Sequence, residues 1–552
     1  MKKWTMKFEL NFPALALLAF STLNLQLSTI SLSAAVLTVT SLADSGLGSL
    51  RDQVAASAAG DTIQFAVSGA ILLNSAISIP HNLTIQGPGP SSLVVDAGFH
   101  DRAFVAAGNP VLLSGMTITH GLALGLNGPD ATNPGQNGGP GLDAYGGVIL
   151  DTSSSSDLLI LSNCWVTENV AQGGNGGRGG DNPAGAAFTP GNGGDGGKAW
   201  GGAIFAGGYL TIVNCTFSFN RAVGGGGGSG GTNDNPAVTL TGGAGGLGGD
   251  AEAGAVFDTV HGPGFTNATF SGNRVTGGSG AKGGDSLNGA GGQGGNGGPA
   301  GGGAIRIFLY GSFTSCTIVS NSAYGGTAGP GGNGGPPGAS GTPESGTAGG
   351  VVGYTLGGCL NTIGNTILAD NFASTVDSNY LIDFDDLGYN FIGSADWTAC
   401  PWGVYSLVGS VTTPIHPQLG PLAQNGGGLP THATSLTSPV TDQGYRFGST
   451  TDERGAPRPY DFISIPNAPG GDGSDIGAFE LGSTDLGLGV AGNNVVLSWP
   501  AYYGDFTLQS ATNLQGSNIW NDLPDAPVVV GSQLVVTNPA TNSMTFYRLI
   551  NR

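Results

Sequence analysis

The sequence contains few charged residues and especially few basic ones. Only 9% of its 552 residues are Asp, Glu, Lys or Arg, whereas a typical globular domain has about 25%. Lys and Arg together number 16 against 36 acidic residues, and the net charge is −20. Because nucleic acids and anionic lipids are bound by clustered Lys and Arg, we expect neither of them as a partner.

Long apolar runs are also scarce. The N-terminus has a basic start at residues 1–7, an apolar run at residues 14–20 and small residues at 33–35. This layout predicts a signal peptide over residues 1–35, and therefore a secreted or cell-surface protein, with a short buried helix as the alternative. No later stretch has the ~18 continuous apolar residues of a membrane span, so we expect no integral membrane segment once the signal is removed.

Glycine, in contrast, is in large excess. It accounts for 105 of the 552 residues, more than twice the average usage of about 7%. Hydrophobic residues still make up 39% of the chain, whereas a fully disordered chain would be more polar and more charged. Part of the protein therefore folds around a core, and separate segments contain most of the glycine.

A repeat lies between the glycine-rich segments. Four strong copies begin at Cys164, Cys215, Ala268 and Cys316, and each is followed five positions later by Asn. Each ordered unit spans roughly 22 residues and contains short alternating apolar runs, which predict strands. Because a unit of this size cannot bury its apolar face alone, the copies must stack. The predicted fold class is all-β: a right-handed parallel β-helix with Gly-rich inserts, followed by a small antiparallel β-sandwich. The Asn column consists of Asn169, Asn220, Asn273 and Asn321.

The three repeat cysteines share one register. Stacking would place Cys164, Cys215 and Cys316 in a column facing the core, where a free thiol behaves as a small hydrophobe. Disulfide bonding is the alternative in an exported protein. With Ala268 between them, Cys215 and Cys316 would lie two coils apart and beyond bridging distance. We therefore expect free thiols.

The inserts after each Asn turn have a local period of three, Gly-Gly-X. Three residues per turn is the repeat of polyproline II, and glycine at packed positions allows such helices close contact. We expect the inserts to stack on one another beside the β-helix. Flexible loops are the alternative interpretation.

The two ends of the chain differ from the repeat region. Residues 49–58 predict a short helix that covers the N-terminal end of the core, with Ser49 as its cap. Residues 485–552 contain several β-rich runs that predict the sandwich. The expected organisation is a signal peptide (1–35), an N-terminal cap with the first strands (36–90), the β-helix with its inserts (91–400), a C-terminal cap (401–482) and the small β-sandwich, a possible sorting module (483–552).

Several segments resemble one family. Residues 43–51 and 59–65, with the closing segments 387–393, 419–427, 452–459 and 475–480, are similar to secreted bacterial right-handed β-helix proteins of the choice-of-anchor Q type. The resemblance implies export and a pectate-lyase-like solenoid, often followed by a sorting module, but no established reaction. The chain departs from the pattern at residues 439–444 and in its much longer inserts.

A catalytic site on such a fold would need carboxylates beside a basic residue. Asp151 and Asp258 fall at one register, two coils or about 10 Å apart, and Arg306 follows on the next coil. This spacing slightly exceeds the window of inverting glycosidases, about 6.5–9.5 Å. The trio is our candidate catalytic site, and surface polar residues are the alternative.

Other acidic residues suggest ion binding or ion pairing. Asp383, Asp385 and Asp386 are candidate Ca²⁺ ligands together with backbone carbonyls, and Ca²⁺ is the one cofactor that the sequence suggests. We expect six charged residues to form ion pairs that hold the C-terminal cap. These are Asp452, Glu453, Arg454, Arg458, Asp475 and Glu480.

The sequence favours a non-catalytic role. We expect a secreted adhesin or other extracellular protein, a stiff β-helix that binds polysaccharide or cell-surface components. The alternative is an extracellular polysaccharide lyase or glycoside hydrolase that acts on an acidic glycan.

Overall fold

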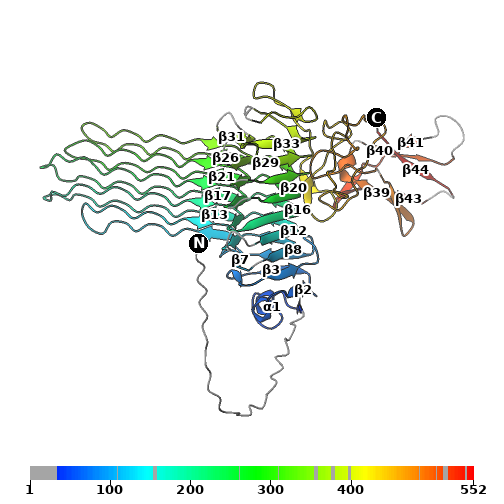
Figure 1. Cartoon of the computed structure of the whole chain (residues 1–552), viewed down its shortest axis with the longest axis horizontal. Helices are drawn as coiled ribbons and strands as arrows, with labels where there is room; N and C mark the ends of the chain where they lie inside the picture. The colour runs from blue at the N-terminus through cyan, green and yellow to red at the C-terminus, as the bar shows by residue number, and fades with distance from the viewer. Residues whose placement is uncertain are drawn as a thin grey trace, which may run out of the picture.

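The computed structural model describes residues 34–108, 110–152, 158–259, 262–308, 310–353, 358–374, 379–395, 400–483, 485–504, 506–513, 520–540 and 544–551. The predicted signal peptide lies outside these residues except for its last two positions. The described chain is nearly all β-structure, and its parallel strands stack in sheets (Figure 1). The predicted fold class, a parallel β-helix followed by a small antiparallel unit, is confirmed.

The largest sheet, sheet 1, runs along the whole β-helix. Its neighbouring strands are parallel and come from successive coils. The main path consists of β1 (Val36–Val39), β2 (Thr62–Phe65), β5 (Leu83–Gln86), β8 (Val111–Thr119), β12 (Leu158–Thr167), β16 (Tyr209–Ser218), β20 (Gly264–Ser271), β25 (Thr317–Val319), β30 (Ile367–Ala369), β34 (Phe391–Ile392) and β35 (Leu407–Val408). The side branches are β3 (Gly69–Leu72), β6 (Leu93–Asp96), β24 (Ser312–Thr314), β29 (Asn361–Gly364) and β33 (Phe384–Gly388).

Two further parallel sheets complete the coils. Sheet 2 contains β4 (Ile77–Ile79), β7 (Phe104–Ala106), β11 (Ile149–Asp151), β15 (Ile204–Ala206), β19 (Val256–Asp258), β23 (Ile305–Ile307), β28 (Val351–Gly353) and β32 (Tyr380–Leu381). Sheet 3 contains β9 (Leu122–Leu124), β13 (Val170–Gln172), β17 (Arg221–Val223), β21 (Arg274–Thr276), β26 (Ser322–Tyr324) and β31 (Phe372–Ala373). Apolar residues from sheets 1 and 2 form one continuous core.

The register agrees with the repeat. Cys164 pairs with Met116 on one side, and Cys215 pairs with Ala268. The Cys164 backbone N–H contacts Cys215 Sγ at 3.4 Å, so these two residues lie on neighbouring coils. Cys164, Cys215 and Cys316 are free and buried, as predicted.

The Asn column is a buried ladder of hydrogen bonds. Asn169, Asn220, Asn273 and Asn321 are at most 1% exposed. In each coil the Asn Nδ2 and backbone N–H both donate to Oδ1 of the next Asn; from Asn169 to Asn220 these distances are 2.8 and 3.1 Å. The ladder continues through Asn371. It satisfies polar groups at each turn that would otherwise be buried without partners.

A short helix lies at the N-terminal end of the core. Helix α1 (Leu50–Ala56) begins after Ser49, whose Oγ accepts a hydrogen bond from the Asp52 N–H at 3.2 Å. Leu50 and Val54 are buried in the main core. The capping residue and the buried face agree with the prediction.

Residues 411–481 contain little regular structure and lie against the outer face of sheet 1. Thr216 Oγ1 donates to the Pro430 carbonyl at 2.8 Å, and the Ala478 N–H donates to Thr317 Oγ1 at 2.9 Å. This segment therefore covers part of one side of the β-helix, and its role as an end cap stays a prediction. It includes an antiparallel pair, β36 (Leu422–Gln424) and β37 (Pro430–His432).

The C-terminal unit consists of two antiparallel sheets. Trp499, Leu508 and Leu534 lie in its core, which also contains Phe479 and Leu481 of the preceding segment. The unit is therefore packed onto that segment. Its first sheet has the order β38 (Gly487–Ala491), β39 (Asn494–Pro500), β43 (Gln533–Pro539), β42 (Val528–Val530), and its second β41 (Asn521–Asp522), β40 (Phe506–Ala511), β44 (Phe546–Asn551).

Candidate functional site

The structure does not bring the candidate catalytic trio together. Asp151 and Asp258 share one column of sheet 2 through Ala206, and each is 1% exposed. Arg306 pairs with Phe257, one position before Asp258. Because successive side chains of a strand point to opposite faces, Arg306 lies on the other face from the two aspartates. Its Nε forms an ion pair with Glu252 instead, at 2.9 Å.

The structure does not gather the three candidate Ca²⁺ ligands at one point either. Asp383 is buried, whereas Asp385 is exposed. The Asp386 carboxylate accepts hydrogen bonds from the Gly403 N–H and Asn390 Nδ2, both at 2.6 Å, so it ties together local backbone. Across the described residues, no group of three or more His, Cys, Asp and Glu is gathered as in a metal site.

The inserts form an ordered structure that we call the panel: residues 125–143, 173–198, 224–250, 277–299 and 325–345. Each insert leaves sheet 3 as an extended outgoing arm and comes back as a returning arm. The arms lie side by side and project from one side of the β-helix (Figure 1). Hydrogen bonds recur at every third residue, as expected for polyproline II helices. The predicted stacking of the inserts is therefore present.

Backbone hydrogen bonds link the arms in two directions. The first glycine of a triplet donates to the same-direction arm of the next insert, as in Gly176 N–H to the Gly226 carbonyl at 2.8 Å. The second glycine donates to the opposite layer, as in Gly177 N–H to the Gly139 carbonyl at 2.8 Å. Outgoing and returning arms therefore form two cross-bonded layers.

Glycine occupies almost all of these positions in the inner inserts because the arms are in close contact, and Ala281 is an exception at the second position. A Cβ on Gly176 would lie 1.9 Å from the Gly194 carbonyl oxygen, and one on Gly177 would lie 2.0 Å from that of Pro129. The third position of the triplet faces outward. Gly226, which occupies that position, would meet nothing closer than 3.4 Å.

Asn and Asp at the third position lie along the faces of the panel. The backbone N–H of this position has no arm in front of it, so a side chain of the preceding arm accepts its hydrogen bond. Asn175 N–H donates to Asn127 Oδ1 at 2.9 Å on the outgoing face, and Leu247 N–H donates to Asp195 Oδ1 at 2.8 Å on the returning face. These bonds hold short polar side chains against the layer, so both faces are ordered and regularly spaced.

Proline blocks the edge arms. Pro129 in the first insert occupies the second position, whose N–H would point to a preceding insert that is absent. Pro337 and Pro343 in the last insert occupy the first position, which in the insert before donates onward from Gly291 and Gly297. Because proline has no N–H, each of these three prolines removes one outward-facing backbone donor from an edge.

The panel joins the β-helix through a small parallel sheet, the root sheet. It consists of β10 (Ala144–Tyr145), β14 (Ala199–Trp200), β18 (Ala251–Glu252), β22 (Ala300–Gly301) and β27 (Gly346–Thr347). Side chains of the root sheet face those of sheet 2. On successive coils, Tyr145, Trp200, Phe205 and Phe257 form an aromatic cluster with ring centroids 5.1–6.5 Å apart.

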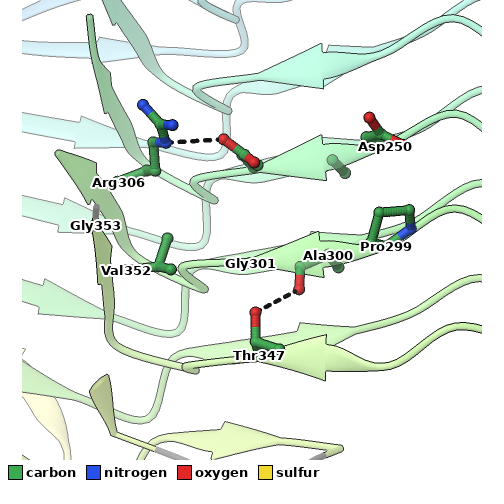
Figure 2. Close-up of a pocket in the computed structure, with 10 residues that line it drawn as sticks. Asp250, Pro299, Ala300, Gly301, Arg306, Thr347, Val352 and Gly353 are labelled. Atoms are coloured by element: carbon green, nitrogen blue, oxygen red, sulfur yellow. Dashed lines mark hydrogen bonds and ion pairs between the residues drawn. The ribbon is translucent and has the colours of Figure 1, made fainter. Parts of the chain in front are cut away.

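A pocket of about 170 Å³ opens where this cluster ends. Its position follows from Gly301, the member of the root-sheet column that has no side chain to pack against Arg306. Figure 2 shows Arg306 and Gly301 on facing strands, with the ion pair from Arg306 to Glu252. The lining residues are Asp250, Ala251, Glu252, Pro299, Ala300, Gly301, Arg306, Thr347, Val352 and Gly353.

Charges in and beside the pocket are paired. Lys198 Nζ lies 2.7 Å from Asp250 Oδ2, and the Arg306 guanidinium also lies over the Phe257 ring at 4.7 Å. Burial raises the pKa of the Glu252 carboxyl, and the positive charge of Arg306 opposes that shift. Arg306 could be selected from the sequence, but Glu252 and the pocket could not, because pairing between two sheets is not visible in a repeat.

A second polar cluster lies where residues 411–481 meet sheet 1. Thr216 Oγ1 lies 2.7 Å from Glu453 Oε1 and 2.8 Å from the Pro430 carbonyl oxygen. A hydroxyl has one proton, and the carbonyl can only accept, so a protonated Glu453 satisfies all three oxygens. Burial correspondingly raises the pKa of Glu453 well above its ordinary value.

Four of the six residues predicted to form ion pairs do so in this cluster, whereas Glu453 and Asp475 form hydrogen bonds. Arg454 Nη2 lies 2.8 Å from Asp452 Oδ2, and Arg458 Nε lies 2.9 Å from Glu480 Oε2. These side chains are at most 5% exposed, so the pairs stabilise the segment internally. They hold the fold and offer no open site.

The structure also contains a disulfide between Cys359 and Cys400. The repeat pattern contained no signal for it, because neither cysteine falls at the position shared by Cys164, Cys215 and Cys316.

Comparisons with known proteins give little further guidance. No family model matches the chain, and a search of curated proteins finds no match. Among solved structures, the chain is similar to an antifreeze protein of the springtail Granisotoma rainieri, a bundle of nine polyproline type II helices on which crystal waters match the ice lattice. The identity is 25% over 41% of this chain and 96% of that chain, with a TM-score of 0.14. At this TM-score the match carries no argument about shape. In the part of the chain that the structure describes, no helix is long and apolar enough to cross a membrane.

Proposed function

We propose that the protein is a secreted or cell-surface, non-catalytic binding protein whose binding surface is the panel. The observation that carries this proposal is the cross-bonded array of arms. An array fixed by backbone hydrogen bonds loses little conformational entropy on binding. Its regularly spaced, short polar side chains suit a partner that is itself extended and repetitive, such as a polysaccharide or another cell-surface polymer.

Export and attachment belong to the same proposal. The signal-like residues 1–35 and the resemblance to the choice-of-anchor Q type support secretion. The C-terminal β-sandwich, which is packed against residues 411–481, is a unit of the kind that the resemblance associates with sorting. The acidic chain, with a net charge of −20, favours uncharged partners over anionic ones.

A polysaccharide lyase or hydrolase is the second candidate, and the geometry disfavours it. Its proposed acids, Asp151 and Asp258, are buried on one face of sheet 2, and Arg306 lies on the other. A reaction would need them around one substrate bond.

The test is a sedimentation assay with insoluble polysaccharides of different chemistry, such as cellulose, chitin and pectin, using the chain from residue 36 onward. We expect binding to at least one of them. Binding should be lost when residues 224–250 are replaced by a short Gly-Ser linker, and retained in Val529→Ser, a control on the exposed surface of the β-sandwich.

Three outcomes would overturn the proposal. Undiminished binding by the linker variant would show that the panel is not the binding surface. Release of unsaturated or reducing sugar products would favour the enzyme. The same assay includes ice as a regularly ordered surface of another chemistry; binding to ice alone would replace polysaccharide as the ligand.

A further inference from the structure

We propose that the pocket beside Gly301 binds one uncharged sugar unit of a polysaccharide. This inference rests on the proposed function and adds a second contact, separate from the faces of the panel. The pocket lies at the junction of the root sheet and sheet 2, and ligand sites commonly form at such junctions. Its volume of about 170 Å³ suits a single ring, since sites for larger organic ligands measure about 300–1,000 Å³.

The charges around the pocket favour a neutral ligand. Asp250 is paired with Lys198, and Glu252 is paired with Arg306. An anionic sugar would meet the two carboxylates, and a cationic ligand would meet Lys198 and Arg306. Sugar hydroxyls both donate and accept hydrogen bonds, so a neutral sugar suits carboxylates and a guanidinium in one small space.

The aromatic cluster extends the site along the β-helix. Trp200 stacks on Phe257 at 5.1 Å, and the Phe257 ring lies beneath the Arg306 guanidinium at 4.7 Å. Trp200 and Tyr145 are partly exposed. Phe257 is buried beneath Arg306, so the accessible rings of this cluster are those of Tyr145, Trp200 and Phe205. A polysaccharide with one unit in the pocket would reach these rings with units farther along its chain.

Gly301 allows a direct test because it determines whether the pocket is empty. A Cβ at Gly301 would lie 3.2 Å from Thr347 Oγ1 and 3.7 Å from Val352 Cγ1. Alanine is therefore accommodated with a small shift, whereas the longer side chain of leucine must occupy the pocket. Gly301→Leu is the filled variant, and Gly301→Ala is its matched control.

The experiment titrates the chain from residue 36 onward with soluble cellohexaose, xylohexaose and oligogalacturonate by calorimetry. We expect a neutral oligosaccharide to bind, at least tenfold more weakly to Gly301→Leu than to Gly301→Ala, with oligogalacturonate the weakest ligand. Circular dichroism and thermal unfolding verify that both variants are folded. If Gly301→Leu does not fold, Glu252→Gln replaces it and should also bind at least tenfold more weakly.

Several results would overturn the inference. They are equal binding by Gly301→Leu and Gly301→Ala, preference for oligogalacturonate, or no binding of any oligosaccharide. The sedimentation assay separates this failure from that of the proposed function. If the chain sediments with polysaccharide equally well whichever residue occupies position 301, the proposed function of the panel stands and the pocket proposal fails.

Discussion

The β-helix and the panel are built from the same coils, yet they hold together by different means. In the β-helix, columns of side chains fill a core, and Met116, Cys164, Cys215 and Ala268 share one column despite their different sizes. In the panel glycine occupies nearly all positions between the inner arms, with Ala281 as an exception, and backbone hydrogen bonds join the arms. A core of side chains tolerates variation in volume, whereas layers in backbone contact tolerate little at two of three positions.

The largest effect is expected when one methyl group is added between the arms of the panel, which tests whether backbone contact holds them together. The Cβ of Gly228→Ala would lie 1.9 Å from the Gly177 carbonyl oxygen, so neighbouring arms must separate. We expect a local cost of about 3 kcal/mol, measured as faster hydrogen exchange over residues 173–181 and 224–232. Gly226→Ala, two residues away at the outward position, should exchange like the parent chain; equal effects of the two variants would contradict the layered packing.

A single substitution in the buried Asn ladder tests the β-helix, as Gly228→Ala tests the panel. Asn220→Ala leaves the backbone N–H of Asn169 without its acceptor, and Asn169 Nδ2 keeps only the Ile118 carbonyl at 3.4 Å. An unsatisfied buried donor costs about 1–3 kcal/mol, so we expect denaturant unfolding of the β-helix to shift by about 2 kcal/mol. Hydrogen exchange in the outer parts of the panel should stay unchanged, and a change of similar size there would show that the two regions unfold as one unit.

Glu453 makes the attachment of residues 411–481 depend on pH. Because burial raises its pKa in the folded chain, the neutral form stabilises the fold at low pH, and this contribution is lost as pH rises through the folded pKa. We expect the unfolding free energy to fall as pH rises from ~5 to ~9. Glu453→Gln, which keeps the shape and cannot ionise, should reduce this slope. The rest should come from Asp442, Asp475 and Glu480, whose pKa values burial raises to about 7, 6 and 8. A slope unchanged by Glu453→Gln would assign it to those groups alone.

The smallest effect is expected on the face of the panel. Asn175 is exposed, and its Oδ1 accepts a hydrogen bond from the Gly226 N–H at 2.8 Å. In Asn175→Ala water can replace this acceptor, so we expect a loss of only about 0.5 kcal/mol by hydrogen exchange at Gly226. A loss as large as that of Asn220→Ala would mean that the face is shielded from solvent.

The repeat predicted the β-helix because identical residue types recur wherever coils stack. The Cys and Asn columns follow from that spacing, and the three-residue period of the inserts predicts their extended arms. The pocket could not be predicted, because it depends on the alignment of Gly301 with Arg306 from a different sheet. The structural role of Asn175 and Asp195 was equally hidden, since Asn and Asp in a glycine-rich segment also suit flexible loops.

The prolines at the edge arms set the width of the protein. Pro129 blocks further growth at one boundary, and Pro337 and Pro343 block it at the other. During evolution, a tandem copy of an inner coil could therefore enlarge the molecule without creating a new aggregation-prone edge. A copy of a terminal coil would place a proline between two arms and remove one backbone hydrogen bond, as Pro190 does at the first position of an inner returning arm. Duplication of an inner coil without such a proline therefore keeps more hydrogen bonds than duplication of a terminal coil.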